Sequence, residues 1–216
     1  MSKRCVAYID GHNFYHGAIK GNGELKWLDL RAMCEQMVKR SKLVAVKYYT
    51  ARVVDLPDDL GQSQRQDIYM QALTASGVEI IEGKFQRRDK NVMIRATGKI
   101  EKARVYEEKG TDVNLAVDLV ADALGGSVDR ALVICNDSDL QRAVDRTMQS
   151  GVGVFVANPY RHRGGRGPGK SRARNNRPSL IGTERINLTR STLLNAQFPD
   201  EVRTSTGLLR RPPGWS

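Results

Sequence analysis

The amino-acid sequence predicts a doubly wound α/β fold, with a mostly parallel sheet and helices on both of its faces. Short, continuously apolar runs such as 5–9 and 131–135 end at polar turns, which is typical of buried parallel strands. Between such runs lie longer stretches whose apolar residues recur at helical spacing. Strand and helix patterns therefore alternate along most of the chain, and this order favours parallel strands joined by crossover helices.

The first half of the chain follows this alternation from its start. The run 5–9 predicts a strand that stops at Asp10, and the next apolar period predicts a helix that begins after Asp29, a suitable N-cap. Further along, the pattern indicates a strand over 43–54, a helix over 62–75 that ends at Gly77, and a strand over 78–81.

The second half begins with a break in this rhythm. Two short strand-like pieces within 85–107 predict a β-hairpin. Helix and strand patterns then resume as a helix opening at Asp112, a strand over 131–135, a helix over 139–149 and a strand over 152–157. Beyond 158 the signals weaken. One more strand and a short helix are predicted within 186–196, and the tail from Phe198, which contains three prolines, is expected to be irregular.

Length and composition narrow the class of protein. A chain of 216 residues is near the size of one large domain, and 40% hydrophobic with 27% charged residues is typical of a globular protein. No apolar run exceeds five residues, so neither a membrane span nor a secretory signal is expected. Three cysteines without metal-site spacing indicate a reducing, cytoplasmic compartment.

Positive charge dominates the chain, with 35 Lys and Arg against 24 Asp and Glu and a formal net charge of +11. Such an excess points to a polyanionic partner. Seven cations and no acid lie within 160–178, a Gly-rich segment that we expect to be a basic loop. Residues 164–171, GGRGPGKS, also match the phosphate-binding P-loop pattern, but neither a directly preceding strand nor a following helical period supports that interpretation.

Four aspartates lie where a sheet of this kind collects its ligands, at the ends of strands or the start of a helix: Asp10, Asp112, Asp137 and Asp139. One such Asp is more often a helix N-cap than a ligand. If several converged, each pair about 4 Å apart would repel by about 4 kcal/mol at an effective dielectric of ~20, and the cluster would need a cation. All-oxygen ligands favour Mg²⁺ or Mn²⁺ over zinc, and such an ion beside a polyanion suggests phosphodiester hydrolysis.

Other side chains have competing interpretations. His12 and His16 are four residues apart, as in zinc-binding helices, but Asn13 replaces the expected Glu, so we favour a turn residue or a substrate contact for His12. Tyr48 and Tyr49 either belong to an ordinary sheet or stack on a base. The three cysteines are expected to be small core residues.

Three stretches resemble the signature motifs of the bacterial NYN domain, LabA-like branch, of the PIN-like nuclease superfamily: 8–13 (YIDGHN), 108–118 (EKGTDVNLAVD) and 136–140 (NDSDL). The C-terminal stretch 197–215 is also similar to that family, so the resemblance covers nearly the whole chain. It implies a three-layer α/β/α PIN-like (Rossmann-like) fold with a central, mostly parallel sheet. It also implies a metal-dependent ribonuclease acting on single-stranded or unpaired RNA.

The resemblance assigns roles to particular positions. Asp10, Asp112, Asp137 and Asp139 match the acids that hold Mg²⁺ or Mn²⁺. Asn13 matches the polar residue that supports the first acid by a hydrogen bond to it or to phosphate, and Lys109 matches a basic position that stabilises charge on the scissile phosphate. Asp118 also matches, but its place on the helix favours a structural role. The RNA backbone is expected to bind the basic loop through Arg161, Arg163, Arg166, Lys170, Arg172, Arg174 and Arg177.

These inferences predict three parts of the chain. Residues 1–158 form the catalytic core, 159–178 the basic loop, and 179–216 a C-terminal segment that packs back on the same domain. A homodimer is compatible with the resemblance, because PIN-like domains often pair. Two alternatives stay open, namely a catalytically inactive RNA-binding or regulatory module with a residual metal site, and a small phosphatase that acts on nucleotides.

Overall fold

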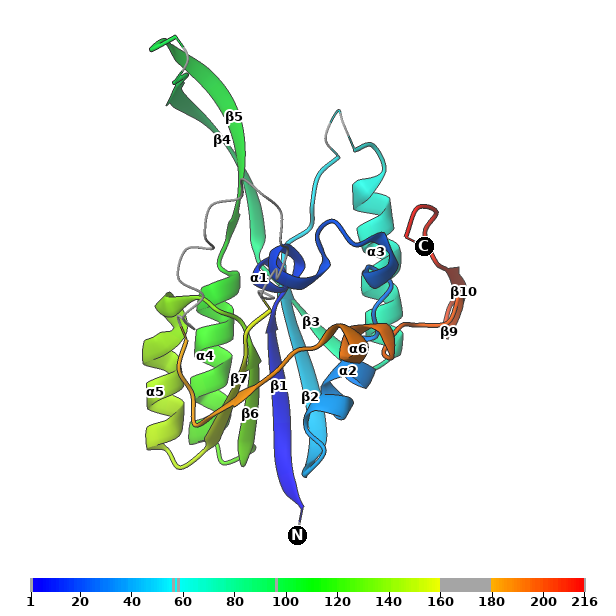
Figure 1. Ribbon diagram of the computed structural model, residues 1–216, viewed down its shortest axis with the longest axis vertical. Coiled ribbons are helices and arrows are strands. Elements are labelled where there is room, and N and C mark those ends of the chain that lie inside the picture. The colour runs from blue at the N-terminus through cyan, green and yellow to red at the C-terminus, as the bar shows by residue number, and fades with distance from the viewer. Residues whose placement is uncertain (1, 56, 58, 96, 160–179, 216) are drawn as a thin grey trace, which may run out of the picture.

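The fold is built on a six-stranded parallel sheet with the strand order β3-β2-β1-β6-β7-β8 (Figure 1). The computed structural model describes residues 2–55, 57, 59–95, 97–159 and 180–215. The strands are β1 (Lys3–Asp10), β2 (Ser41–Thr50), β3 (Val78–Glu82), β6 (Arg130–Ile134), β7 (Gly153–Ala157) and β8 (Glu184–Ile186). The chain adds strands to one side of β1 and then to the other, so the sheet has a topological switch point between β1 and β6.

Helices cover both faces of this sheet. The helical elements are α1 (Gly11–Phe14), the π-helix η1 (Tyr15–Ile19), the 3-10 helix η2 (Gly23–Leu25), α2 (Leu30–Met37), α3 (Gln62–Ala75), α4 (Thr111–Leu124), the 3-10 helix η3 (Ser138–Leu140), α5 (Gln141–Gln149) and α6 (Arg190–Leu194). One hydrophobic cluster joins the sheet to α1, α2, α3 and α6, and a second joins it to α4 and α5. The predicted three-layer α/β/α fold is confirmed.

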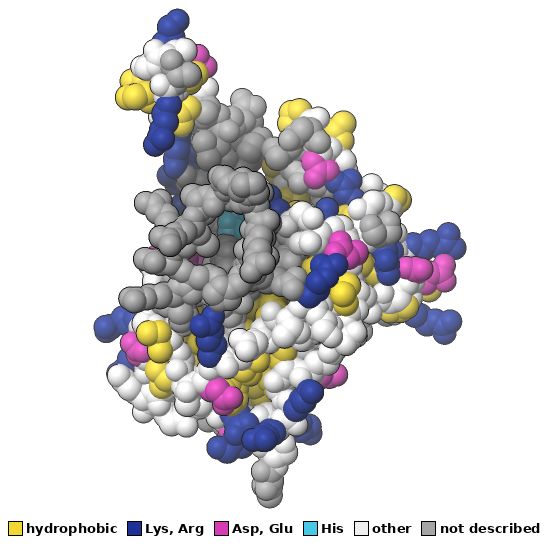
Figure 2. Space-filling view, in the orientation of Figure 1, with side chains coloured by type: hydrophobic (Ala, Val, Ile, Leu, Met, Phe, Trp, Pro, Cys, Tyr) yellow, Lys and Arg dark blue, Asp and Glu magenta, His cyan; other side chains and the backbone are white. Residues whose placement is uncertain are grey.

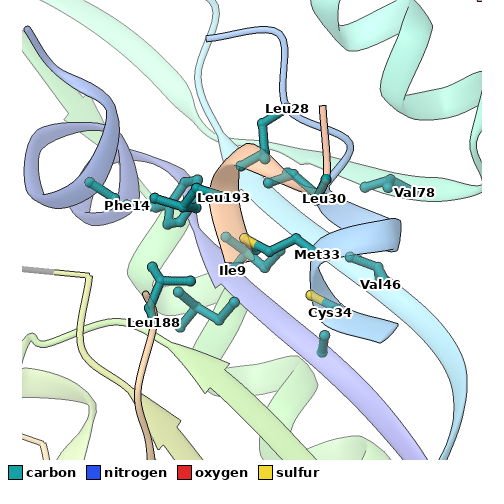
Figure 3. Packing of buried hydrophobic residues seen from close by; sticks show 14 of the residues in the cluster. Ile9, Phe14, Leu28, Leu30, Met33, Cys34, Val46, Val78, Leu188 and Leu193 are labelled. Atoms are coloured by element: carbon teal, nitrogen blue, oxygen red, sulfur yellow. The ribbon is translucent and has the colours of Figure 1, made fainter. Parts of the chain in front are cut away.

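The central strand β1 shows why the strand patterns could be recognised. Cys5, Ala7 and Ile9 belong to the first cluster, whereas Val6 and Tyr8 belong to the second. Successive side chains on a strand point to opposite faces, and here both faces are covered, so the run is continuously apolar. Figure 3 shows Ile9 and residues of α2 within the first cluster.

The predicted hairpin is a separate antiparallel ribbon of β4 (Lys84–Met93) and β5 (Ile100–Lys109) that projects from the body of the protein (Figure 1). Figure 2 shows Lys and Arg side chains along it and hydrophobic side chains near its tip, where Met93 and Ile100 are exposed. Gly83 lies at its base, and a Cβ there would come within 2.7 Å of the Lys109 carbonyl oxygen. The absence of a side chain at Gly83 therefore allows the two strands to meet beside the start of α4.

The prediction of an irregular C-terminal tail is wrong. Residues after Phe198 form an antiparallel hairpin of β9 (Glu201–Thr204) and β10 (Gly207–Arg210). Val202 and Leu209 are cross-strand partners and pack on the first cluster, which supplies the burial that stabilises a short hairpin. The prolines that suggested irregularity lie outside both strands. The segment is also joined to the core by a 2.7 Å hydrogen bond from Trp27 Nε1 to the Pro199 carbonyl oxygen.

Among the residues that the structure describes, no helix is both long and apolar enough to cross a membrane.

Candidate active site

The predicted site lies at the switch point of the sheet. β1 and β6 are parallel neighbours, with Ile9 opposite Ile134, so the residues that follow them meet at one edge. Asp10 ends β1, and Asp137 lies shortly after β6. The crevice outside the carboxyl ends of strands at a switch point is where open α/β sheets bind their ligands.

Asp10 is the most firmly held of the predicted acids. Its side chain is buried, with only 4% of the residue exposed. Oδ1 accepts a hydrogen bond from the Asn13 backbone N–H at 2.9 Å, and Oδ2 accepts one from the Cys135 thiol at 3.0 Å. Burial raises the pKa of Asp10, whereas these two hydrogen bonds lower it. Burial also raises the pKa of Cys135 and keeps its thiol protonated, as a donor must be.

The polar turn expected after β1 is the start of a helix. Asp10 caps α1 through its bond to Asn13, so the helix begins without a loop. A Cβ at Gly11 would lie 2.6 Å from the Tyr49 carbonyl oxygen and 2.9 Å from the Tyr48 ring. Only glycine lets α1 approach β2 this closely, and this tertiary contact left no periodic signal in the sequence.

Asp112 approaches the site from the base of the ribbon. β5 ends at Lys109, Gly110 takes the left-handed conformation with φ of +90°, and α4 begins at Thr111 with Asp112 in its first turn. Desolvation and the negative charges of Asp10 and Asp137 raise the pKa of Asp112 to about 6. Asp112 therefore lies close enough to Asp10 and to Asp137 to be repelled by both.

The two acids after β6 differ in what they do. Asp137 Oδ1 accepts a 3.0 Å hydrogen bond from the Asp139 backbone N–H and so caps η3. The Asp137 backbone N–H donates to Cys135 Sγ at 3.2 Å, which links this turn to the thiol that holds Asp10. Asp139 is exposed and contributes its backbone to this cap. The structure thus gathers Asp10, Asp112 and Asp137, with Asp139 further along the turn.

Asn13 and Lys109 are near the acids along the chain, since Asn13 follows Asp10 in α1 and Lys109 precedes Asp112 at the end of β5. The hydrogen bond from Asn13 to Asp10 comes from the Asn13 backbone, while its side-chain Oδ1 accepts from the Asn136 backbone N–H at 3.1 Å. Asn13 therefore ties α1 to the loop after β6. Lys109, the last residue of β5, is exposed next to Gly110.

Two residues at the site, Glu108 and His12, had no assigned catalytic role in the sequence analysis. The Glu108 side chain is 14% exposed, and its Oε2 lies 3.6 Å from His12 Nδ1. Hydrogen bonding to Glu108 raises the pKa of His12. Glu108 Oε1 is buried without a hydrogen-bond partner among the described residues. The sequence signal for Glu108 was its place at the start of the motif-like stretch 108–118, where no role was assigned to it.

Other predicted residues lie elsewhere. Tyr49 is buried, and its hydroxyl donates to Asp118 Oδ2 at 2.9 Å, which gives Asp118 a structural contact on β2. The seven cations predicted to bind RNA, and the P-loop match within the same segment, lie outside the described residues.

The donor chemistry of the acids suits a hard divalent cation, since carboxylate oxygens are the ligands that Mg²⁺ and Mn²⁺ prefer. A cation between Asp10, Asp112 and Asp137 would relieve the repulsion that raises the pKa of Asp112. Within the described part of the chain, no three His, Cys, Asp or Glu side chains are placed so that they could already hold a metal ion. Metal binding would therefore need side-chain rotation.

A cleft opens beside the acids at the same edge of the sheet. Its volume is about 650 Å³, and it lies between α1 with η1 on one side and the start of α3 on the other. His12 and Glu108 form its border with the acids, and Trp215 closes it from the C-terminal segment.

The fold and the acids at its switch point define an α/β protein of the PIN-like class. A model of the NYN domain family matches residues 4–164, and the chain belongs to this family. Membership in the NYN family indicates a nuclease-type function.

The proteins that resemble the chain include an enzyme and a protein of known structure. The chain is 30% identical over 171 residues to 6-hydroxy-3-succinoylpyridine 3-monooxygenase from Pseudomonas putida, a match that covers 65% of this chain and 54% of that protein. The chain thus spans about half the length of this relative. A crystal structure of a protein of unknown function from Vibrio parahaemolyticus has a TM-score of 0.51 at 18% identity, covering 88% of this chain and 94% of that one. This likeness shows the fold alone.

Proposed function

We propose that the protein is a metal-dependent ribonuclease that cleaves phosphodiester bonds of single-stranded or unpaired RNA, with Mg²⁺ or Mn²⁺. The observation that supports this most directly is the position of Asp112, whose pKa is raised to about 6 by desolvation and by the negative charges of Asp10 and Asp137. Carboxylates are brought together against their own charge where a cation or a proton is to be bound.

In this proposal, Asp10, Asp112 and Asp137 hold the metal ion, and Asp139 completes the set by side-chain rotation. A bound ion of this kind polarises a phosphoryl oxygen and lowers the pKa of an attacking water. Asp10 is kept in place by the Asn13 N–H and the Cys135 thiol. Lys109, exposed at the end of β5, stabilises negative charge on the phosphate.

The proposal extends to the organisation of the protein. Residues 1–158 carry the reaction, the cations within 159–178 hold the RNA backbone, and 179–216 completes the same domain. We place the protein in the LabA-like branch and in the cytoplasm, and a homodimer stays a prediction.

Two other functions compete with this one. The Pseudomonas putida relative is named as a monooxygenase of a pyridine compound, and the cleft beside the acids has the aromatic lining that a small ring-shaped substrate would need. The other alternative is a catalytically inactive module that binds RNA through the same surface.

One set of assays separates these functions. Purified protein is incubated separately with labelled RNA, with single-stranded DNA and with a phosphomonoester. A fourth incubation contains a hydroxypyridine together with NADH and oxygen. Each incubation is done once with Mn²⁺ and once with EDTA. Cleavage of RNA that needs Mn²⁺ and is lost in Asp112→Asn, but kept in Asp200→Asn, supports the ribonuclease. Asp200 is a suitable control because its side chain is 83% exposed, at the far C-terminal hairpin. RNA binding without cleavage, or turnover of the pyridine alone, would refute it.

A further inference from the structure

The cleft next to the acids has the size and position of a ligand site. Its volume of about 650 Å³ falls within the ~300–1000 Å³ range of small-molecule sites. Tyr48 and Thr50, at the carboxyl end of β2, form part of its lining. In Figure 1, α1 lies over the upper end of the sheet and α3 lies to its right. A molecule in the cleft would therefore lie beside Asp10 and its neighbours.

Three ring side chains lead from the acids into the cleft. His12, at the border with Glu108, stacks on His16 with ring centroids 4.4 Å apart. The His16 ring is in turn 5.4 Å from Tyr15, in an edge-to-face arrangement. All three residues line the cleft and are exposed, Tyr15 by 40%. Because the Tyr15 and His16 rings are nearly perpendicular, a flat ligand in the cleft can stack on the face of Tyr15 and meet the other rings at an angle.

The local backbone is unusual at the same place. After one turn of α-helix the chain forms the π-helix η1, which contains Tyr15 and His16. π-helices are rare and are frequent at functional sites, because the wider turn re-aims its side chains. Here Tyr15, His16 and Ile19 line the cleft, while Ala18 is buried in the core.

Two of the lysines that line the cleft are available to bind a ligand. Asp59 is paired with Arg65, and Glu108 with His12. Lys20 and Lys26 line the cleft and have no carboxylate within ion-pair distance in the described ranges. Lys26 Nζ lies 5.8 Å from the centre of the Trp215 ring, which holds this amine near the opening. The combination of aromatic surface and spare positive charge fits an aromatic ring that carries a negative group.

We propose that the cleft binds one nucleotide of the RNA substrate, with its base stacked on Tyr15 beside the edge of His16 and a phosphate near Lys20 and Lys26. Single-stranded RNA is commonly recognised through unstacked bases that lie on aromatic side chains. The inference rests on the proposed ribonuclease function and extends it, because a nucleotide held here places an adjacent phosphodiester at the acids. Burial lowers the pKa of His16, which favours the neutral form of its ring.

The proposal is tested by calorimetric titration of the full chain with adenosine 5′-monophosphate in EDTA. The wild-type protein should bind it, and more tightly than adenosine or ribose 5-phosphate. Tyr15→Ala should weaken binding by about tenfold or more, the scale of one base on an aromatic ring, while Tyr15→Phe keeps it. The double variant Lys20→Gln with Lys26→Gln should weaken binding of the nucleotide by about fivefold and leave adenosine unchanged.

The control variant is Lys42→Gln, which should bind the nucleotide like the wild type. Lys42 is exposed and lies near the start of β2, at the opposite edge of the sheet from the cleft. Thermal melting confirms that each variant is folded. Failure of the wild type to bind the nucleotide, equal binding by Tyr15→Ala, or tighter binding of uncharged 2-hydroxypyridine would each overturn the proposal. The last result would favour the small-ring substrate instead.

Cleavage assays distinguish a failure of the nucleotide site from a failure of the proposed ribonuclease activity. Tyr15→Ala should raise KM for RNA by about tenfold with kcat within about twofold of the wild type. Asp112→Asn should lower kcat while it still binds the mononucleotide in EDTA. Nucleotide binding that depends on Tyr15, in a wild-type protein that cleaves no RNA, would support the nucleotide site and refute the ribonuclease. RNA cleavage that is unaffected by Tyr15→Ala would refute the nucleotide site and leave the ribonuclease standing.

Discussion

Replacement of Asp112 by Asn should stabilise the metal-free protein at neutral and higher pH. Desolvation and the charges of Asp10 and Asp137 raise the pKa of Asp112 to about 6, whereas an unfolded Asp titrates near ~3.9. The folded chain therefore binds this proton more tightly than the unfolded chain. The resulting stability is present below about pH 4 and is lost as the pH rises through about 6. Above that pH the ionised carboxylate opposes folding.

The size of the effect follows from the shift and from the exposure of the side chain. The full shift corresponds to about 3 kcal/mol, but Asp112 is exposed and solvent screening reduces this to about 1 kcal/mol. For a chain of this length, Tm should rise by roughly 2–4 °C. Calorimetry in EDTA would measure the gain, which should be complete at pH 8 and about half as large at pH 5.

The control for this experiment is Asp200→Asn, whose exposed carboxylate is distant from the site and should give no gain. Added Mn²⁺ should raise Tm of the wild type more than that of Asp112→Asn, because a ligand stabilises the state that binds it. A lower Tm of Asp112→Asn at pH 8, or a gain independent of pH, would refute the electrostatic coupling of the three acids.

Asp10→Asn should lower RNA cleavage by at least about 100-fold while the chain still folds, and a rate assay with Mn²⁺ and labelled RNA that gave normal turnover would remove Asp10 from the site. Gly11→Ala should lower the free energy of unfolding by about 1–3 kcal/mol, since its Cβ would lie 2.6 Å from a β2 carbonyl oxygen. Urea unfolding would compare it with Gly153→Ala, whose Cβ meets nothing nearer than 3.9 Å. Replacing the seven cations of 160–178 with Gln should flatten the salt dependence of RNA binding, whose log–log slope should be about −3 if about four of them contact phosphates. Filter binding that gave an unchanged slope would place the RNA-binding cations elsewhere.

The fold was predictable to the extent that burial leaves a local pattern. β1 and β6 are buried on both faces, so their sequences are continuously apolar. α2 has both an apolar period and a capping Asp29, whose side chain accepts from the N–H groups of Arg31 and Ala32. By contrast, α1 is only four residues long and depends on the close approach of Gly11 to β2, which no local period records. The C-terminal hairpin was missed because its nearby prolines outweighed a short alternation.

The site residues that follow parallel strands could be predicted from the sequence, whereas Glu108, in the ribbon of β4 and β5, could not. The positions of Asp10 and Asp137 follow from the rule that ligands collect at the carboxyl ends of parallel strands. Glu108 is one of many charged residues in a hairpin that is exposed along most of its length. It is largely buried only because β5 ends at the sheet edge, against His12. That contact joins residues about a hundred positions apart, so spacing alone could not reveal it.

The three acids are held by two separate parts of the fold. Asp10 and Asp137 share Cys135, whose buried thiol donates to the Asp10 carboxylate and accepts from the Asp137 backbone N–H. Asp112 is placed by the turn at Gly110 that joins the projecting ribbon to α4. Cys135 therefore contacts the surroundings of Asp10 and Asp137, whereas the position of Asp112 depends on the ribbon and on α4.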